Sequence, residues 1–398
     1  MHKSRLRCLA AVIALATTMV PCRADWPNFR GPNHDGISTE TGLKTQWRST
    51  LPLVWERELG SAFSSFSIVG DRLFTCGLKA GKQVLFCLDA NKGTILWENP
   101  FEDEYKNDFG DGTRATPTVD DGRVFILGAN GRLLCADAKS GRTLWSTKFG
   151  SPPTWAYSGS VLVEGDLAIA SAGGTGGSLV AFNKKTGQRV WKTGNDPVGY
   201  ATPYPFTLEG ERYVVGFLGN AAIIVEATTG REVWRIPWET DWEVNASSPV
   251  FDNGYLLLTS GYRTGASVMH LTRVGDKLSS ETVWKSKVLV NKFQSCILHN
   301  GSLYTSDQKA FKCVDFLTGA LRWRVPRVKH GTLVLAENHL YLLNERGELQ
   351  VAPVSTEGFK PTGHAEILSG KCWSLPVINH GKLYARNLTR VVAFDIRK

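Results

Sequence analysis

No stretch of this 398-residue chain keeps a 3.6-residue apolar period over three helical turns, which argues against a helical fold. The sequence also lacks Cys-x-x-Cys, His-x-His and His-Glu-x-x-His, so zinc ribbons, redox dithiols and zinc hydrolases have no support. Gly-x-Ser-x-Gly, the turn that carries a hydrolase nucleophile, is absent as well. We therefore expect neither catalytic residues nor metal ligands.

Long apolar runs are missing except at the N-terminus, where residues 9–20 follow three basic residues and lead to Cys22-Arg23-Ala24. This layout is typical of a cleavable secretory signal, and we place cleavage before Asp25. The run is shorter than the roughly 20 residues of a membrane helix. Lipidation at Cys22 is the alternative, which Pro21 and the lack of small residues before it disfavour. The sequence predicts a periplasmic or secreted protein without a transmembrane segment after cleavage.

Runs of lysine and arginine are missing too, although the formal net charge is +9. Four positive charges and no negative ones lie in residues 1–24, so removing that segment lowers the net charge to +5. The remaining charges are scattered, without the basic and aromatic interleaving that follows a phosphate backbone. We therefore do not expect a nucleic-acid partner.

Cysteine is sparse in the mature chain, with six residues. Three of them, Cys87, Cys135 and Cys313, stand two residues before a recurring acid, where other copies of the same motif have Ala or Ile. A position that accepts Cys, Ala and Ile is a tight buried slot, so packing explains these three. A disulfide between Cys76 and Cys87 across one hairpin is left open.

One motif is abundant: a short apolar run, an acid, a glycine four residues later and a tryptophan four residues after that. Residues 85–97 give the first copy, with Asp89, Gly93 and Trp97, and five further copies follow, the last of them truncated at Asp395. Counting the position of the acid gives eight units, at Asp89, Asp137, Asn183, Glu226, Leu271, Asp315, Asn344 and Asp395. Most spacings fall within the ~40–50 residues of a four-stranded propeller blade, with one short and one long gap around Asn344.

The segments between these landmarks are short, rich in β-branched and aromatic residues, and separated by Asp-Gly, Asn-Gly or Gly-Asp turns, as in β-hairpins. The sequence therefore predicts an all-β, eight-bladed β-propeller with four-stranded antiparallel blades. The last copy lacks its tryptophan, and Trp55 near the N-terminus lacks its acid, so we expect the N-terminal strand to complete the last blade. The expected domains are a signal peptide at 1–24, an extension at 25–52 and the propeller at 53–398.

Seven of the thirteen tryptophans occupy one recurring slot, where we expect them to dock between neighbouring blades: Trp55, Trp97, Trp145, Trp191, Trp234, Trp284 and Trp323. The other six are free for another role: Trp26, Trp47, Trp155, Trp238, Trp242 and Trp373.

The pattern apolar-Ala/Cys-apolar-Asp-x-x-x-Gly-x-x-x-Trp resembles the tryptophan-docking repeat of pyrroloquinoline-quinone (PQQ)-type propellers, from about Trp55 to Asp395. One branch of this family contains quinoprotein dehydrogenases, and that resemblance implies a PQQ cofactor and calcium that oxidise alcohols or sugars. The other branch is similar to the outer-membrane barrel-assembly lipoprotein and implies partner binding without a cofactor. The segment 25–38 also resembles the start of many exported propellers of this superfamily.

The non-catalytic branch is favoured because this chain lacks the lid insertions and the vicinal Cys-Cys pair of many quinoprotein dehydrogenases. Calcium needs six to eight oxygen ligands, and Asn245 with nearby Glu243 supplies the only plausible ones at the blade entrances. PQQ and calcium are therefore expected only under the oxidoreductase alternative.

The residues that open each blade suggest a second alternative, a small-ligand or sugar site in the central funnel. Basic, aromatic and hydroxyl side chains dominate there and suit an anionic or aromatic molecule or an acidic peptide, although such channels are usually filled with water. The expected funnel residues are Arg114, Trp155, Tyr157, Tyr200, Asn245, Lys292, His330 and Trp373.

Two insertions lie between blades. The acidic segment 101–112 faintly resembles a calcium loop but lacks the terminal glutamate, so we interpret it as a solvated loop. The segment 238–243 carries Trp238 and Trp242, which we expect as an exposed aromatic pair that binds a protein partner at the rim.

From the sequence we expect an exported, monomeric propeller that acts as a protein-interaction or scaffolding module at the cell envelope. Its partner would be an envelope protein or peptide that the sequence does not identify. An oxidoreductase dependent on PQQ and calcium is the first alternative, and a small-ligand or sugar binder is the second.

Overall fold

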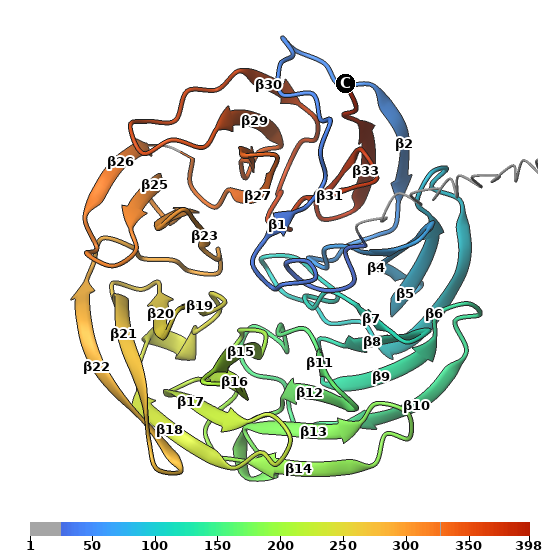
Figure 1. The fold of residues 1–398 in the computed structure, drawn as a ribbon. Helices are drawn as coiled ribbons and strands as arrows, with labels where there is room; N and C mark the ends of the chain where they lie inside the picture. The colour runs from blue at the N-terminus through green and yellow to red at the C-terminus, as the bar shows by residue number, and fades with distance from the viewer. Residues whose placement is uncertain (1–24, 327) are drawn as a thin grey trace, which may run out of the picture.

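A computed structural model describes residues 25–326 and 328–398, in which nearly all regular structure is β-strand. Eight β-sheets surround a central axis as the blades of a propeller (Figure 1). The predicted all-β, eight-bladed fold is confirmed. Two 3₁₀ turns, Gly174–Gly176 (η1) and Asp241–Glu243 (η2), are the helical elements of this part of the chain, and no helix in it is long and apolar enough to cross a membrane. The predicted signal at 1–24 lies outside the described residues.

The first four blades take consecutive strands from the inner edge to the outer edge. Blade 1 comprises β3 (Ser67–Val69), β4 (Arg72–Lys79), β5 (Lys82–Asp89) and β6 (Ile95–Asp103). Blade 2 comprises β7 (Thr118–Asp120), β8 (Arg123–Leu127), β9 (Arg132–Asp137) and β10 (Thr143–Lys148). Blade 3 comprises β11 (Leu162–Glu164), β12 (Leu167–Ser171), β13 (Leu179–Asn183) and β14 (Arg189–Thr193). Blade 4 comprises β15 (Tyr204–Leu208), β16 (Glu211–Phe217), β17 (Ala221–Glu226) and β18 (Glu232–Pro237).

The other four blades continue the ring, and two of them also use strands from the N-terminal side. Blade 5 comprises β19 (Val250–Asp252), β20 (Tyr255–Ser260), β21 (Gly265–Val274) and β22 (Lys277–Ser286). Blade 6 comprises β23 (Ile297–His299), β24 (Ser302–Ser306), β25 (Ala310–Asp315) and β26 (Leu321–Pro326). Blade 7 comprises β27 (Thr332–Ala336), β28 (His339–Leu343), β29 (Glu348–Pro353) and β30 (Gly363–Glu366), with β1 (Ile37–Ser38) as a fifth strand. Blade 8 comprises β31 (Val377–Asn379), β32 (Lys382–Arg386) and β33 (Arg390–Asp395), with β2 (Leu53–Glu58) as its outer strand.

All strand pairs are antiparallel except one. β2 pairs with β33, so a strand from the N-terminal side completes blade 8 beside the C-terminal strand, as predicted, and the ring is closed. β1 pairs in parallel with β27, the innermost strand of blade 7, through Ile37 with Leu335 and Ser38 with Ala336. The extension therefore adds a strand on the inner side of the ring.

The recurring tryptophans join neighbouring blades through one repeated contact. Trp97 on the outer strand of blade 1 donates its indole N–H to the carbonyl of Ala138 in blade 2 at 3.2 Å and lies over Gly141. Five more indoles donate in the same way to the next blade: Trp55 to Ala90, Trp145 to Lys184, Trp191 to Ala227, Trp284 to Phe316 and Trp323 to Ser355. We call these seven tryptophans, Trp234 included, the tryptophan ring.

The acid and the glycine of the repeat have distinct physical roles. Asp89 accepts hydrogen bonds from the backbone N–H groups of Asn91 and Lys92, which fixes the turn between the third and fourth strands. Gly93 in that turn has φ +68°, and a Cβ there would lie 2.5 Å from the Cδ2 atom of Trp55. Glycine is needed both for the left-handed backbone and for the space that the indole fills.

Strand register corrects two of the eight landmarks. Trp284 lies opposite Val268, whereas Trp97 lies opposite Cys87, so the position of the acid in blade 5 is His270 and not Leu271. In blade 7 His339 pairs with Pro353, as Arg72 pairs with Asp89 in blade 1, which places the landmark at Pro353 rather than Asn344. Asn344 instead follows β28. With this correction the spacing no longer has one short and one long gap. The sequence pattern misplaced both landmarks because neither true position carries an acid.

The cysteines are free and buried, in agreement with packing as the role of the repeat cysteines. Cys76 pairs with Leu85 and Cys87 pairs with Phe74 in the β4–β5 hairpin. The two thiols are therefore diagonal neighbours, at a spacing of about 7–8 Å between such positions, beyond the reach of a disulfide. Burial raises the pKa of the Cys76 thiol to about 12, so this thiol stays protonated.

The N-terminal extension crosses one end of the ring from blade 1 to blade 6. Trp26 is 2% exposed and pairs with Ile68 of β3, while Val119 in blade 2 donates its N–H to the carbonyl of Pro27. Arg30 is 3% exposed and donates to the carbonyl of Cys296 beside β23. Figure 1 shows this segment, in blue, running across the centre of the ring beside β1. It closes one end of the central channel.

Candidate functional site in the central funnel

Each blade places one side chain at the axis, two residues before a position that joins it to the next blade. We call the eight positions the axial ring: Phe63, Arg114, Ser158, Tyr200, Ala246, Phe293, His330 and Trp373. Seven of the eight, all except His330, line one cavity of about 240 Å³. We call this cavity the funnel.

The positions two residues further along hold the ring together through hydroxyl groups. The backbone N–H of Ser65 donates to Thr116 Oγ1 at 3.1 Å, that of Thr116 donates to Ser160 Oγ at 2.9 Å, and that of Ser160 donates to Thr202 Oγ1 at 2.9 Å. Ser65 Oγ extends this series to blade 8 by donating to the carbonyl of Leu375 at 2.6 Å. These bonds between blades fix where each axial side chain points.

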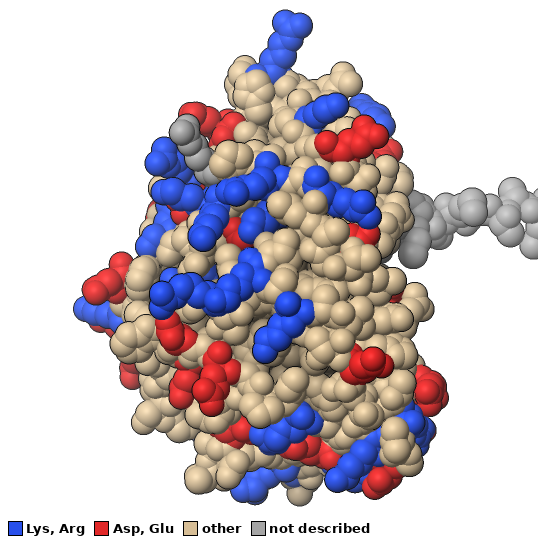
Figure 2. Space-filling view, turned by 90° about the vertical axis from the view of Figure 1, so that its left-hand side faces the viewer, with Lys and Arg blue, Asp and Glu red and all other residues tan. Residues whose placement is uncertain are grey.

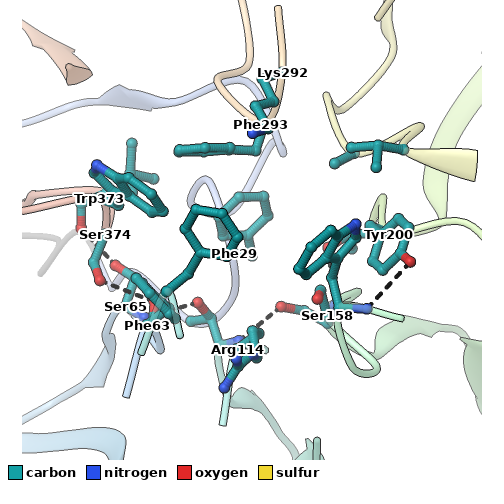
Figure 3. A pocket seen from close by; sticks show the side chains of 18 of the residues that line it. Phe29, Phe63, Ser65, Arg114, Ser158, Tyr200, Lys292, Phe293, Trp373 and Ser374 are labelled. Carbon is teal, nitrogen blue, oxygen red and sulfur yellow. Dashed lines mark hydrogen bonds between the residues drawn. The ribbon is translucent and has the colours of Figure 1, made fainter. Parts of the chain in front are cut away.

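Aromatic rings form the walls of the funnel. Trp373 lies 5.7 Å from Phe63 and 5.0 Å from Phe293, measured between ring centroids. Phe109 lies 5.3 Å from Trp155 and 6.2 Å from Trp373, so it bridges two sides of the mouth. Figure 3 shows Phe29, Phe63, Phe293 and Trp373 grouped around one space, with Arg114 below them and Tyr200 opposite.

Phe29 of the extension forms the floor. The neighbouring Arg30 holds it in place by donating from Nε to the carbonyl of His34 at 3.0 Å and from Nη2 to the carbonyls of Asp35 at 2.8 Å and Cys296 at 2.6 Å. Burial lowers the pKa of the Arg30 guanidinium. The guanidinium of Arg30 is satisfied by these backbone oxygens and anchors the extension. The extension closes one end of the funnel, and the other end is open.

Three cations surround the mouth. The guanidinium of Arg114 lies 4.6 Å from the Tyr105 ring centroid and 5.4 Å from that of Phe63, and it donates to the carbonyls of Gly110 and Gly112. Lys292 Nζ lies 5.6 Å from the centroid of Phe109, as does Lys371 Nζ. Burial lowers the pKa of Arg114 to about 10 and also lowers the pKa of Lys371.

The lining of the funnel contains no aspartate or glutamate among the described residues. The outer wall of the ring differs. In Figure 2, which shows the side where β22 and β26 lie, basic and acidic side chains are interspersed. The funnel lining thus has basic side chains without acidic ones, unlike the side of the ring seen in Figure 2.

Five of the eight predicted funnel residues line the cavity: Arg114, Trp155, Tyr200, Lys292 and Trp373. Tyr157 and Asn245 do not. Tyr157 is 2% exposed and donates its hydroxyl to the carbonyl of Ala172, and Asn245 is fully buried and donates to the carbonyls of Leu218 and Trp238. The next residues along the chain, Ser158 and Ala246, face the cavity instead, because a shift of one residue in extended backbone turns a side chain to the other face.

His330 belongs to the axial ring but lies behind the lining. Its ring stacks on Phe293 at 5.2 Å between centroids, and its Nδ1 lies 3.1 Å from Glu345 Oε2. Burial lowers the pKa of His330, and Glu345 opposes that shift. Lys329 also pairs with Glu345, at 3.1 Å, so this carboxylate is already shared and His330 supports Phe293 rather than contacting the cavity.

The predicted exposed aromatic pair at the rim is half wrong. Trp238 is 6% exposed and its indole N–H donates to Ser260 Oγ at 3.0 Å, so it packs inside blade 4. Trp242 is 66% exposed in η2, where its φ of +63° turns the side chain outward. Only Trp242 offers an apolar surface to a partner.

Sequence reasoning missed Phe29, Phe63, Phe109, Tyr262 and Phe293, all of which line the funnel. Phe63 and Phe293 stand two residues before Ser65 and Ser295, in the same spacing as Arg114 before Thr116, so that pattern could have found them. Phe109 is 42% exposed and comes from the acidic segment 101–112, whose first residues belong to β6 and whose remainder is the exposed loop that the sequence predicts. Neither its position nor that of Phe29 follows from the repeat.

The residues of the funnel do not fit a calcium ion with PQQ. Calcium needs six to eight oxygen ligands, whereas the lining has no carboxylate and Asn245 Oδ1 already accepts from Ser260 and Thr240. The described residues contain no group of three or more His, Cys, Asp or Glu that could hold a metal. Phe29 fills the floor with an apolar ring. The donor set suits an anion and not a metal ion.

Comparison with known proteins gives a consistent family. The profile of the family described as outer membrane protein assembly factor BamB matches residues 37–195, 81–325 and 219–398. The outer membrane protein assembly factor BamB of Burkholderia pseudomallei is 27% identical over 201 residues, which are 47% of this chain and 48% of that protein. The quinoprotein ethanol dehydrogenase of Pseudomonas putida is 27% identical over 164 residues, which are 37% of this chain and 26% of that protein.

The solved structure of BamB from Moraxella catarrhalis has a TM-score of 0.65 at 16% sequence identity, and the match covers 87% of this chain and all of that one. At this identity the likeness shows the fold alone. The matched regions span about half or less of the length of the two curated relatives. Both non-catalytic and catalytic propellers are therefore similar to this chain.

Proposed function

The chain belongs to the family described as outer membrane protein assembly factor BamB, and we propose that it is a non-catalytic propeller that binds or scaffolds proteins at the cell envelope. The observation that carries this proposal is the funnel lining, in which no carboxylate stands ready to act as a base or to hold calcium. Calcium needs six to eight oxygen ligands, which carboxylates usually supply. The lysine, arginine and aromatic side chains at the mouth suit the binding of an anionic partner group.

An oxidoreductase that uses PQQ and calcium is the second candidate, supported by the similarity to quinoprotein ethanol dehydrogenase. The test is to incubate the purified protein with PQQ and calcium, then to record the absorbance of the cofactor and the dye-linked oxidation of alcohols. We expect neither a shift of the absorbance nor oxidation. Turnover that depends on both PQQ and calcium would replace the first proposal with the second.

The proposed partner is an envelope protein or peptide that contacts the rim at Trp242, the exposed tryptophan beside the funnel mouth. A photo-crosslinking residue at position 242 should capture the same protein repeatedly from envelope extracts. The matched control is the same residue at Val190, which is 53% exposed on the outer strand β14 of blade 3. Equal capture at both positions would show that Trp242 is not a binding site.

Export through the leader at 1–24, action as a monomer and a periplasmic or secreted location complete the proposal. A fusion of the full chain to a reporter that is active only in an oxidising compartment tests the location. Reporter activity that depends on residues 1–24 supports export, and activity in the cytosol contradicts it. Sedimentation of the purified protein tests the monomer.

A further inference from the structure

Three cations at the funnel mouth have no ion-pair partner in the described part of the chain: Arg114, Lys292 and Lys371. The two lysine Nζ atoms each lie 5.6 Å from the centre of the Phe109 ring, and Lys371 Nζ also lies 4.6 Å from the centre of Trp373. Arg114 is half-buried and contacts carbonyl oxygens and aromatic faces rather than carboxylates, and Lys371 donates to the carbonyl of Phe109. Positive charge that no carboxylate of the described residues pairs with is stabilised by an anion.

Trp155 adds a further aromatic wall. Its ring lines the funnel and lies 5.3 Å from Phe109 between ring centroids. Its indole nitrogen is buried without a hydrogen-bond partner among the described residues, so the ring and not the N–H group is what a ligand in the funnel meets.

The size and walls of the cavity restrict what such an anion carries. A cavity of about 240 Å³ exceeds the roughly 150 Å³ that holds benzene, and it is smaller than the roughly 300–1,000 Å³ of sites for drug-sized ligands. Phe63, Phe293 and Trp373 offer ring faces and edges for stacking. One or two aromatic rings fill this space.

We propose that the funnel binds an aromatic carboxylate of one or two rings, either as a free acid or as the C-terminal aromatic residue of a peptide. The ring lies against Trp373 and Phe293, and the carboxylate lies toward Lys292 and Lys371, the two lysines beside Phe109. This site is inside the ring rather than on the rim, so its occupancy is measurable whether or not a protein engages Trp242.

Calorimetric titration of the full chain tests the ligand class with phenylacetate, indole-3-acetate and N-acetylphenylalanine. N-acetylphenylalaninamide and acetate are the matched probes, because one lacks the charge and the other lacks the ring. We expect each matched probe to bind at least tenfold more weakly than its parent. Absence of binding by all three aromatic acids, or equal binding of the amide, would overturn the proposal.

A fourth probe, a pentapeptide that ends in a free C-terminal phenylalanine, separates the two sources. Binding of this peptide at least as tight as that of phenylacetate assigns the site to protein C-termini. Binding of the free acids alone assigns it to a small molecule. Both outcomes keep the aromatic carboxylate as the ligand.

Variants locate the binding in the funnel. The double change Lys292→Ala with Lys371→Ala should weaken N-acetylphenylalanine at least tenfold and reduce the dependence of affinity on salt. The matched control is Lys277→Ala with Lys287→Ala, which removes two exposed lysines in and just after β22 and should leave affinity unchanged. Equal losses in both double variants would show a non-specific charge effect and contradict the site.

Trp155→Leu is the variant that removes the aromatic ring from the funnel wall and keeps an apolar side chain. It should weaken binding about fivefold while the circular dichroism stays that of the wild type. Unchanged affinity in both this variant and the lysine double variant would sink the assignment of the ligand to the funnel.

Discussion

The tryptophan ring and the axial ring each have about one position per blade, but they differ in how many residue types fill those positions. The tryptophan ring on the outer strands repeats one residue type at seven positions, whereas the axial ring of the funnel has eight different positions filled by seven residue types. In the tryptophan ring five indoles meet the same surroundings, a carbonyl and a glycine of the next blade: Trp55, Trp97, Trp145, Trp191 and Trp284. In the axial ring the side chains share one space, and what each of them meets depends on all the others.

The difference teaches which positions stabilise the fold and which are free for binding. A contact repeated between every pair of neighbours requires the same residue each time, because the neighbours present the same backbone. A shared cavity imposes no such requirement. We therefore expect substitutions in the tryptophan ring to cost stability and substitutions in the funnel to cost ligand binding.

The largest expected effect comes from Trp191→Ala in the tryptophan ring. Trp191 is 8% exposed, donates to the carbonyl of Ala227 at 3.2 Å and covers Gly230. We expect a loss of about 3–5 kcal/mol in the free energy of unfolding, measured by urea denaturation. Trp242→Ala is the matched control and should change stability by less than about 0.5 kcal/mol. Equal effects of the two changes would break the comparison.

The floor of the funnel tests whether the inner region is free of structural roles. Arg30→Ala removes three hydrogen bonds to buried or half-buried carbonyls, and we expect it to cost about 2–3 kcal/mol of unfolding free energy. We expect this cost because the extension, unlike the side chains of the axial ring, has a structural role: Arg30 binds it to blade 6. A cost below about 0.5 kcal/mol would mean that the extension is not anchored there.

The same floor should respond to pH through His34. Burial lowers the pKa of His34 to about 4, with Arg212 and Arg30 adding to the effect. The unfolded chain takes up the proton near pH 6.5 and the folded chain does not, so stability is lost as pH falls from about 6.5 to about 4. For this half-buried group we expect about 1–2 kcal/mol.

His34→Gln provides the control for that measurement, because it removes the titration and keeps a polar side chain. The pKa of the neighbouring Asp35 is raised by burial, which acts in the opposite direction, so the difference between wild type and variant isolates His34. Chemical denaturation between pH 7 and pH 4 gives this difference. Parallel curves would contradict the buried, neutral histidine.

The smallest effect on stability is expected for the funnel cations. Lys292→Ala and Lys371→Ala should each change the free energy of unfolding by less than about 0.5 kcal/mol, because neither ammonium group has an ion-pair partner among the described residues. A gain in stability would sharpen the comparison, since it would show unpaired charge kept at a cost to the fold. Thermal melting of the wild type and of each variant at two salt concentrations measures the change in stability and its dependence on charge.

The repeat made the architecture predictable because each blade uses the same acid, glycine and tryptophan for the same turn and the same contact. Prediction was less accurate where the repeat is degenerate, as in blades 5 and 7, where His270 and Pro353 stand at the position that an acid occupies in other blades. In the funnel, five of the eight predicted residues line the cavity. Tyr157 and Asn245 are each one residue away from the residue that does, and in extended backbone a shift of one residue turns the side chain to the opposite face.

The sequence by itself determined the number of blades, the tryptophan contacts and the β-class, because these depend on local periodicity and on one interface repeated between neighbours. Only the tertiary structure decided what fills the axis. Phe29 reaches the floor because β1 pairs inside blade 7 and Arg30 bonds to blade 6, and Phe109 reaches the mouth from a long loop. Such contacts join segments far apart in the chain, and no local pattern encodes them.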